Sequence, residues 1–481
     1  MNPNLTAITI LVAWPVIGII LGILLPIRHA VLLAILGGNL LLPATAIALP
    51  GFPNYTKTVA AGLGALLPSV VFESAKLFGL RPKLLDTFFV GFLLAPSLSS
   101  LANQQGLYDA GSTLVNRFLE WGVAYWVGRA LFNDLHSLKD LSKGIVLSGV
   151  LYAPLCIFEI ALSPQLSRIV YGFRPSAFSM TYRMGGWRPM VFMQHGLALA
   201  AWMAAATLVA WILWRSKAIR QICGIPMPWI AIGLVILTIW LRSTGAAILL
   251  LGLICAAEFI QITRLRIILI VMAMIPMGYI GLRTFGWDGH QMISLASQLD
   301  ADRAQSLEVR LENDQMIADK AMQRPVFGWG GWGRWRVKDE YGRDITISDS
   351  WWAILLGTTG VFGLVCTYAT FISPLFPLSR HKSKARIFYG PVGAAWAVGF
   401  GVLLFVLDTL ANAMPNTSFI LMSACLVSVY PLVTPEAMKR MYAQRQPSSP
   451  NAQHPTVAPT PTATDPQPTD PAHNPLPDQS S

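Results

Sequence analysis

The sequence is poor in charged residues. Asp, Glu, Lys and Arg make up 12% of its 481 residues, whereas hydrophobic residues make up 54%; a soluble globular domain carries about 25% charged residues. This deficit excludes an ordinary soluble domain. Apolar runs long enough to cross a hydrocarbon core, which takes roughly 20 helical residues, recur along nearly the whole chain. We therefore expect an all-α integral membrane protein.

Cysteine is also scarce and lacks any paired pattern. The five cysteines lie within or beside apolar runs at wide spacings: Cys156, Cys223, Cys255, Cys366 and Cys425. No motif for zinc binding or disulfide exchange is present, and no set of His, Cys or carboxylate residues has metal-ligand spacing. We expect five unpaired thiols and no metal site.

Thirteen apolar runs are candidate membrane spans, which predicts a bundle of about 12–13 transmembrane helices. They are residues 5–25, 30–50, 59–78, 87–102, 114–132, 144–162, 191–214, 226–241, 245–262, 267–282, 351–373, 391–411 and 416–434. The first run has no basic residue before it and no small-residue cleavage site after it, which favours a retained span over a signal peptide. The third and fifth runs contain charged side chains, which normally face a bundle interior or the interface: Glu73, Lys76, Arg117, Glu120 and Arg129.

The basic residues orient the predicted bundle. The formal net charge is +11, but the Lys and Arg residues fall in short clusters between apolar runs, which indicates membrane orientation rather than nucleic-acid binding. Clusters at 215–220, 264–266 and 380–386 mark a cytoplasmic side. The connections 163–190 and 283–350 and the turn at Arg242 then lie on the external side.

This frame divides the chain into two regions. Residues 1–434 form a polytopic membrane domain with a large external loop, 283–350, between two late spans. Residues 435–481 form a Pro-rich tail that lacks enough large apolar residues to fold, so we expect a disordered cytoplasmic extension.

The large external loop has features of an ordered segment. Connections of more than about 15 residues tend to be functional or disordered. Residues 306–322 place apolar side chains at helical spacing, which predicts an amphipathic surface helix: Leu307, Leu311, Gln315 or Ala318, and Met322. Residues 324–336 combine glycines and arginines with three tryptophans. This segment is either an interfacial anchor or a lip over which a lipid-linked substrate enters.

Arginines gather on the predicted external side, where the positive-inside bias disfavours them. Arg174, Arg183 and Arg188 precede the core of the seventh run, and Arg242 follows the eighth. A guanidinium group binds phosphate through a bidentate fork and stays charged at physiological pH. The pattern indicates an anionic partner, unless these cations and those of the large loop are neutralised by the loop's own acids.

Several short motifs follow one another in a distinctive order over about residues 170–370. They are 183–186 (RMGG), 241–246 (LRSTGA), Arg310 with 325–330 (PVFGWG), Asp349 with Ser350, and 360–363 (GVFG). In order and placement they resemble the O-antigen ligase and O-antigen polymerase superfamily, membrane glycosyltransferases that use polyprenyl-diphosphate-linked sugar donors on the external face. The N-terminal half matches only as a hydrophobic bundle.

The chain departs from the family pattern at one position. Family members typically have His followed by Asn, Ser or Gln and, after nine further residues, Gly-x-x-Gly. Ser350, Gly360 and Gly363 keep the spacing, but Asp349 stands where histidine is expected. A carboxylate can act as a general base, although an unperturbed pKa of about 3.9 makes it weaker than histidine unless burial raises that pKa.

The resemblance implies roles for individual residues. Arg183 and Arg310 would hold the donor diphosphate and neutralise the leaving group without a metal or cofactor. Asp349 would orient or deprotonate the acceptor hydroxyl, with inversion at the anomeric carbon; His195 and His290 are alternative replacements for the missing histidine. The substrate-binding candidates are Arg188, Arg242, Arg174, Trp329, Trp332 and Ser350.

The resemblance also implies a location and partners. It places the chain in a bacterial inner membrane, with a polyprenyl-diphosphate-linked oligosaccharide, a glycan or lipid acceptor and the bilayer as partners. Polysaccharide export or chain-length proteins are further candidates, and nucleic acid is not. Polymer extension is slightly preferred over transfer to a lipid core.

Three other functions fit parts of the sequence. A transporter or flippase of lipid-linked saccharides would be supported by discontinuous helices. A noncatalytic assembly protein could recruit partners through its Pro-rich tail. A related glycosyltransferase class uses an acidic pair in its first external loop, but residues 51–57 contain no acid, which makes this class the weakest alternative.

Overall fold

The computed structural model describes residues 3–298, 301–380 and 392–429. The chain divides into two compact units, Met1–Met438 and Lys439–Ser481, and all the described residues belong to the first. The predicted tail, 435–481, and almost all of the predicted basic cluster at 380–386 lie outside the described residues.

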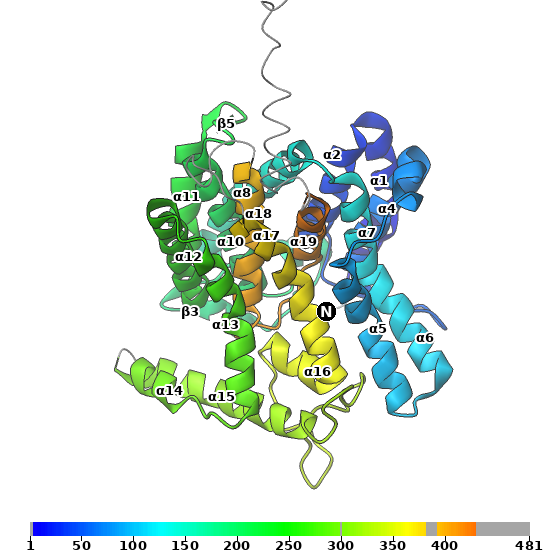
Figure 1. The fold of residues 1–481 in the computed structure, drawn as a ribbon, viewed down its shortest axis with the longest axis vertical. Helices are drawn as coiled ribbons and strands as arrows, with labels where there is room; N and C mark the ends of the chain where they lie inside the picture. The colour runs from blue at the N-terminus through cyan, green and yellow to red at the C-terminus, as the bar shows by residue number, and fades with distance from the viewer. Residues whose placement is uncertain (1–2, 299–300, 381–391, 430–481) are drawn as a thin grey trace, which may run out of the picture. The chain divides into compact units, whose positions relative to one another are not determined.

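Helices dominate the described part of the chain, and seven of them are long and apolar enough to cross a membrane (Figure 1). They are α1 (Leu5–Leu24), α4 (Lys57–Phe78), α8 (Leu135–Leu162), α10 (Gly196–Ser216), α12 (Thr244–Thr263), α13 (Ile267–Thr284) and α16 (Trp351–Ile372). These helices make the chain a membrane-embedded, largely helical protein, as its composition predicts.

Shorter apolar helices occupy five further predicted runs. They are the helical segment 27–41, α5 (Asp86–Ala102), α11 (Met227–Trp240), α18 (Val392–Asp408) and α19 (Thr417–Val429). The first of these consists of α2 (Ile27–Leu32), a π-helical turn (Leu33–Gly37) and α3 (Gly38–Leu41). The second predicted run, 30–50, therefore ends its helix at Leu41, because the backbone becomes extended at Leu42.

The fifth predicted run, 114–132, lies in a helical segment that begins earlier than expected. It comprises α6 (Gly106–Arg117), a π-helical turn (Phe118–Gly122) and α7 (Val123–Leu131). Its charged residues are accommodated inside the protein: Arg117 lies over the Phe92 ring at 5.1 Å, and Arg129 is buried in an ion pair. Such residues normally face the bundle interior.

Strands are few in the described residues. They are two residues long and pair into three antiparallel hairpins. β1 (Ala46–Ile47) pairs with β2 (Tyr55–Thr56), β3 (Tyr182–Arg183) with β4 (Gly186–Trp187), and β5 (Gln221–Ile222) with β6 (Ile225–Pro226). Four short helical elements complete the described structure. α9 (Leu166–Tyr171) and the 3-10 turn Phe178–Thr181 precede β3, and the 3-10 turn Ser373–Leu375 and α17 (Phe376–Arg380) follow α16.

Helix α10 forms the centre of the bundle. It is buried along almost its whole length and packs against α8, α11, α12 and α18. Alanines at 198, 200, 201, 204, 205, 206 and 210 let neighbouring helices approach closely, as small residues do in membrane bundles. A helix that is apolar all round is expected at such a buried position.

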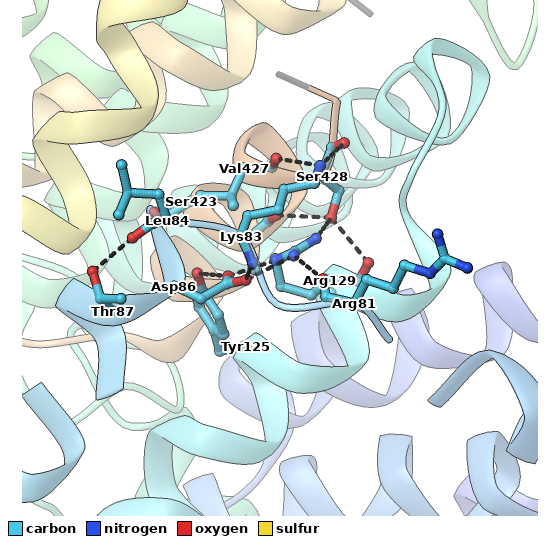
Figure 2. A network of polar contacts seen from close by, with 12 residues as sticks. Arg81, Lys83, Leu84, Asp86, Thr87, Tyr125, Arg129, Ser423, Val427 and Ser428 are labelled. Carbon is cyan, nitrogen blue, oxygen red and sulfur yellow. Dashed lines mark hydrogen bonds and ion pairs between the residues drawn. The ribbon is translucent and has the colours of Figure 1, made fainter. Parts of the chain in front are cut away.

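A buried polar network joins α5, α7 and α19 (Figure 2). Both carboxylate oxygens of Asp86 accept hydrogen bonds from Arg129, at 2.7 and 2.8 Å, and Tyr125 donates a third at 2.7 Å. Arg129 Nη1 also donates to Ser428 Oγ at 2.9 Å. Multiple hydrogen bonds of this kind are what a desolvated ion pair requires.

Contacts between remote segments hold several connections in place. Arg28 pairs with Asp134 at 2.7 Å, and Arg215 at the end of α10 pairs with Glu258 of α12 at 2.6 Å. The Asn103 side chain donates to the Gly328 carbonyl of the large loop at 2.9 Å.

The large loop contains two helices, α14 (His290–Ser297) and α15 (Ala301–Ala321). α15 fulfils the prediction of a helix over 306–322, but its buried face differs slightly: Leu307 is half-buried and Met322 is exposed. The buried positions are Ala304, Leu311, Asn313, Asp314, Ile317, Ala318 and Ala321. The difference arises because α15 packs across α13 and α16 (Figure 1).

Candidate functional site

An ion pair joins the large loop to the start of α16. Arg310 of α15 lies with its Nε 3.2 Å from Oδ2 of Asp349, and the two side chains are 38% and 42% exposed. Asp349 directly precedes Ser350, the N-cap residue of α16. The pair of residues that the sequence predicts as diphosphate ligand and base is therefore adjacent and accessible to a ligand.

A second carboxylate, which the sequence motifs do not predict, lies behind this pair. Asp314, one helical turn after Arg310, is 3% exposed, and its Oδ2 accepts a 2.6 Å hydrogen bond from the Ser350 hydroxyl. Burial raises the pKa of Asp314 to about 6, against the opposing effect of the Ser350 hydrogen bond. The signal in the sequence is an Asp on the face of the predicted helix that also carries Leu311 and Ala318.

Arg183 and Arg188 approach the same site from the connection 163–190. Arg183 ends β3 and is exposed. Arg188 follows β4, and its Nε donates to the Arg242 carbonyl at 3.4 Å. Arg242 itself donates from Nη1 to the Met184 carbonyl at 2.5 Å. The hairpin thus presents two arginines and is held in place by a third.

The glycines of this region make room for the arginines. A Cβ on Gly186 would lie 2.5 Å from Cζ of Arg242, and a Cβ on Gly196 would lie 2.4 Å from Cδ of Arg188. Both contacts are far shorter than van der Waals distance. The second glycine of the 183–186 motif therefore has a packing role, because a side chain there would displace the Arg242 guanidinium from its place.

The electrostatics indicate that two of the three arginines, Arg183 and Arg188, lack a counter-ion. Burial lowers the pKa of Arg188, and the nearby cations Arg183 and Arg310 lower it further. Among the described residues, neither Arg183 nor Arg188 forms an ion pair. Three guanidinium groups face a single exposed carboxylate, Asp349, which already pairs with one of them. An anionic ligand would relieve this crowding.

His195 lies in the same cluster, at the N-cap of α10. Its Nδ1 accepts the Leu197 N–H at 3.1 Å. Burial lowers its pKa, as does Arg188, whereas Asp349 has the opposite effect. A neutral ring that accepts at Nδ1 carries its proton on Nε2, so His195 is arranged as a hydrogen-bond donor. His290, the other histidine considered, is exposed at the start of α14 and contacts Asp288 through its backbone N–H at 2.9 Å.

A buried glutamate positions the segment that carries Arg188 and His195. Glu159 of α8 is 1% exposed. Its Oε2 accepts the N–H groups of Met190 and Val191 at 2.8 and 2.7 Å, and its Oε1 accepts the Leu166 N–H at 2.9 Å. Val191 has a φ of +52°, which a β-branched residue adopts only under constraint. No sequence signal pointed to this role, since Glu159 lies within an apolar run.

Three predicted substrate-binding residues lie outside the cluster. Arg174 donates to Gln165 Oε1 at 2.7 Å and stacks over Phe178 at 4.2 Å. Trp329 donates to the Lys320 carbonyl at 2.8 Å, and the 81% exposed Trp332 donates to Asp109 at 3.1 Å. Trp329 and Trp332 thus form contacts with the loop backbone and α6, respectively.

The glycine motifs at 325–330 and 360–363 bind each other. α16 is broken at Gly360, where φ is +64° and ψ is −166°, a combination open essentially to glycine alone. The N–H of Val361 donates to the Pro325 carbonyl at 2.7 Å, and the N–H groups of Trp329 and Gly330 donate to the carbonyls of Gly357 and Thr358, both at 2.9 Å. The segment thus satisfies the backbone groups freed by the break.

These contacts bear on the two interpretations of the tryptophan-rich segment. Residues 325–330 are docked on the break in α16, so this part of the segment has a structural role that neither an interfacial anchor nor an entry lip requires. The acids of the loop also neutralise some of its cations: Arg336 pairs with Asp344, and Arg343 pairs with Asp339 at 2.8 Å.

The predicted residues that the structure brings together, with Asp314, form what we call the arginine–carboxylate site. Its members are Arg183, Arg188, His195, Arg310, Asp314, Asp349 and Ser350. No protein-family model matches the chain, and no curated protein matches it. The chemistry of this site is therefore the basis for assigning a function.

Proposed function

We propose that the chain is a membrane glycosyltransferase of the O-antigen ligase and polymerase type. It would transfer or polymerise an oligosaccharide from a polyprenyl-diphosphate donor during surface polysaccharide synthesis. The observation that supports this most strongly is the placement of three crowded arginines beside an accessible carboxylate. Arginines suit a diphosphate, and the carboxylate suits an acceptor hydroxyl.

In the proposed reaction, the acceptor oxygen attacks the anomeric carbon of the donor sugar. Its proton passes to the Asp349 carboxylate as the new glycosidic bond forms. The bond between the anomeric carbon and the diphosphate oxygen breaks, and its electron pair stays on the diphosphate. Arg183 and Arg310 stabilise the charge that develops there, and a single displacement inverts the anomeric configuration.

The Arg310–Asp349 pair couples the two substrates. A bound diphosphate competes with Asp349 for Arg310, because both anions interact with the same guanidinium. Its binding therefore leaves the carboxylate free to accept a proton or hydrogen-bond the acceptor. Neutral His195 adds an N–H donor, and the Asp314–Ser350 hydrogen bond fixes the start of α16.

The membrane arrangement is part of the same proposal. We place a bundle of about 12–13 transmembrane helices across a bacterial inner membrane. In this arrangement the loop 283–350 is external and the C-terminal tail is cytoplasmic. The partners would be the lipid-linked oligosaccharide, a glycan or lipid acceptor, and export or chain-length proteins. Polymer extension is preferred over transfer to a lipid core.

The transporter alternative gains little from the helix breaks. Transporters use unwound backbone groups to bind their substrates. At the break in α16, the backbone groups are instead bonded to residues 325–330. A second break in an apolar helix, at Glu73 in α4, lies beside Lys76, which pairs with Glu73 at 2.6 Å.

Binding and product formation test the proposal separately. Full-length protein in lipid nanodiscs is titrated with undecaprenyl diphosphate, with Arg310→Ala and Arg183→Ala as test variants and Arg343→Ala as the control. Arg343 lies on the same loop but is 74% exposed and pairs with Asp339. We expect both test variants to weaken binding at least tenfold and the control to match the wild-type protein.

Surface polysaccharide from a deletion strain provides the second measurement. Complementation with wild-type protein should restore long polymer, whereas well-expressed Arg310→Ala and Arg183→Ala should not. Full restoration by both variants would show that the proposed site is wrong and would favour the transporter or assembly function.

A further inference from the structure

A cavity with a mixed polar and apolar lining lies near the arginine–carboxylate site. Its volume is about 340 Å³, within the range of pockets that bind small ligands. It is formed by four separate segments: α3 with the residues that lead from it into β1, the end of β2 with the start of α4, residues 193–194, and residues 415–416. The polar residues that line it are Asn39, Thr45, Thr56, Lys57, Thr58, Gln194 and Asn416.

The floor of this cavity is held rigidly. Lys57 Nζ donates to the Asn39 carbonyl at 3.0 Å. The Asn39 side chain is 4% exposed and donates to Thr417 Oγ1 at 3.0 Å and to Ser418 Oγ at 3.2 Å. These bonds link the start of α4 to the start of α19. Such a network preorganises a pocket, because its side chains are already fixed before a ligand binds.

Two walls of the cavity continue directly into the arginine–carboxylate site. Gln194 precedes His195, whose pKa is affected by Arg188 and Asp349. Asn416 ends the connection that contains Ala411, and the Ala411 carbonyl lies 3.4 Å from Nη1 of Arg310. The chain therefore connects the cavity to the proposed diphosphate and carboxylate groups at two points.

The side chains that line the cavity indicate which class of ligand it can bind. Amide and hydroxyl side chains both donate and accept hydrogen bonds, which matches a polyhydroxylated molecule. The described lining residues include one cation, Lys57, and no carboxylate. This composition favours a neutral or anionic ligand over a cation.

We propose that this cavity binds the saccharide end of the glycan acceptor and holds its hydroxyl toward Asp349. This inference rests on the proposed glycosyltransferase function, and it names residues remote in sequence from every motif that suggested that function. It also favours a sugar rather than a lipid tail as the group recognised, since hydrogen-bonding side chains contribute to the lining from each of the segments that form the cavity, between apolar patches that suit the carbon face of a sugar ring.

Thiol protection tests the cavity directly. Thr58→Cys places a thiol at its rim, and Tyr108→Cys places a control thiol on α6, where Tyr108 is 75% exposed. Both variants carry Cys223→Ser and Cys255→Ser, since these two native cysteines are exposed. The probe is the oligosaccharide released from the host's surface polysaccharide by mild acid, added to full-length protein in nanodiscs during maleimide labelling.

We expect the oligosaccharide to slow labelling at position 58 about threefold when it occupies two thirds of the protein, and to leave position 108 unaffected. Undecaprenyl diphosphate without sugar should protect neither position. Equal labelling of position 58 with and without the oligosaccharide would overturn the inference.

Two further variants separate this inference from the proposed function. Gln194→Leu and Thr58→Val should lose polymer formation at least tenfold while binding undecaprenyl diphosphate like the wild-type protein. If they form normal polymer, the acceptor cavity is wrong and the glycosyltransferase proposal stands. If the wild-type protein does not bind undecaprenyl diphosphate, the glycosyltransferase proposal fails, and with it the assignment of the cavity to an acceptor.

Discussion

Asp349 and Arg310 neutralise each other in an accessible ion pair, with 3.2 Å between the carboxylate Oδ2 and the guanidinium Nε. An exposed pair of this kind contributes only about 0–1 kcal/mol to stability. The pair matters more for function, because a guanidinium that contacts a carboxylate has fewer donors free to bind a phosphate. Substrate binding must separate the two groups.

Asp349→Asn is expected to lower product formation without weakening the binding of the diphosphate. Product formation should fall by roughly 10²–10⁴-fold, the usual contribution of a general base. Undecaprenyl diphosphate should bind as tightly as in the wild-type protein or more tightly, because Arg310 loses its competing anion. Nanodisc titration and polymer analysis measure the two effects, and weaker diphosphate binding by this variant would contradict the proposed competition.

Asp314 should make stability depend on pH. Its pKa is about 6 in the folded protein and about 3.9 when unfolded, so the folded state binds the proton more tightly. The associated stability is complete below about pH 4 and is lost as the pH rises through about 6, by roughly 3 kcal/mol. Asp314→Asn should therefore melt higher, relative to the wild-type protein, at pH 8 than at pH 5.

The exposed Asp319 on the same helix provides a control for this measurement. Asp319→Asn changes the net charge equally but removes no buried carboxyl. Its melting temperature at each pH is the reference with which that of Asp314→Asn is compared. Identical pH profiles for the two variants would show that Asp314 has no raised pKa.

Glu159 should act as a positioning residue. Glu159→Gln removes the charge that holds three backbone N–H groups, which we expect to cost about 1–3 kcal/mol of stability. Displacement of Arg188 should then weaken undecaprenyl diphosphate binding several-fold. Glu258→Gln, which breaks the ion pair with Arg215, should leave that binding unchanged. A purely structural role for Glu159 would lower the melting temperature without changing diphosphate affinity.

Loss of Arg129 should destabilise the protein strongly. Arg129→Leu leaves the Asp86 carboxylate without its main partner in a largely buried position (Figure 2), which typically costs about 3–5 kcal/mol. Arg343→Ala, which removes an exposed pair, should cost less than about 1 kcal/mol. Fluorescence-detected size-exclusion chromatography after heating compares the two, and equal melting temperatures would contradict the prediction.

Gly360→Ala should disrupt the docked loop. A Cβ at this position would lie 2.4 Å from the Val326 carbonyl oxygen, and the backbone conformation alone costs about 1–3 kcal/mol for a residue other than glycine. Gly278→Ala in α13 is the matched control, because nothing lies within 4 Å of its added Cβ. We expect a lower melting temperature and little polymer for the first variant, and no loss for the second.

Much of the fold could be predicted because it depends on local composition. A helix lies within every predicted apolar run, and the helix 306–322 follows from the spacing of its side chains. The helix boundaries were less predictable. The π-helical turns and the end of the helix at Leu41 depend on packing against neighbouring helices, which no single run discloses.

The candidate site was predictable only in part, for the same reason. Arginine chemistry and motif order pointed to Arg183, Arg188 and Arg310, and the tertiary structure brings these residues together around Asp349. Trp329 and Trp332 carried the same sequence signal, yet they lie elsewhere. Asp314 and Glu159 carried almost none, because a buried carboxylate is distinguished by its partners rather than by its neighbours along the chain.

The sequence by itself determined that this protein is helical and membrane-embedded, since a shortage of charge and long apolar runs act additively along the chain. Only the tertiary structure decided which cations lack a counter-ion, which carboxyl is buried and which glycines pack against a broken helix. These properties depend on distances between segments that are remote in the sequence, and electrostatic and packing energies are set by those distances.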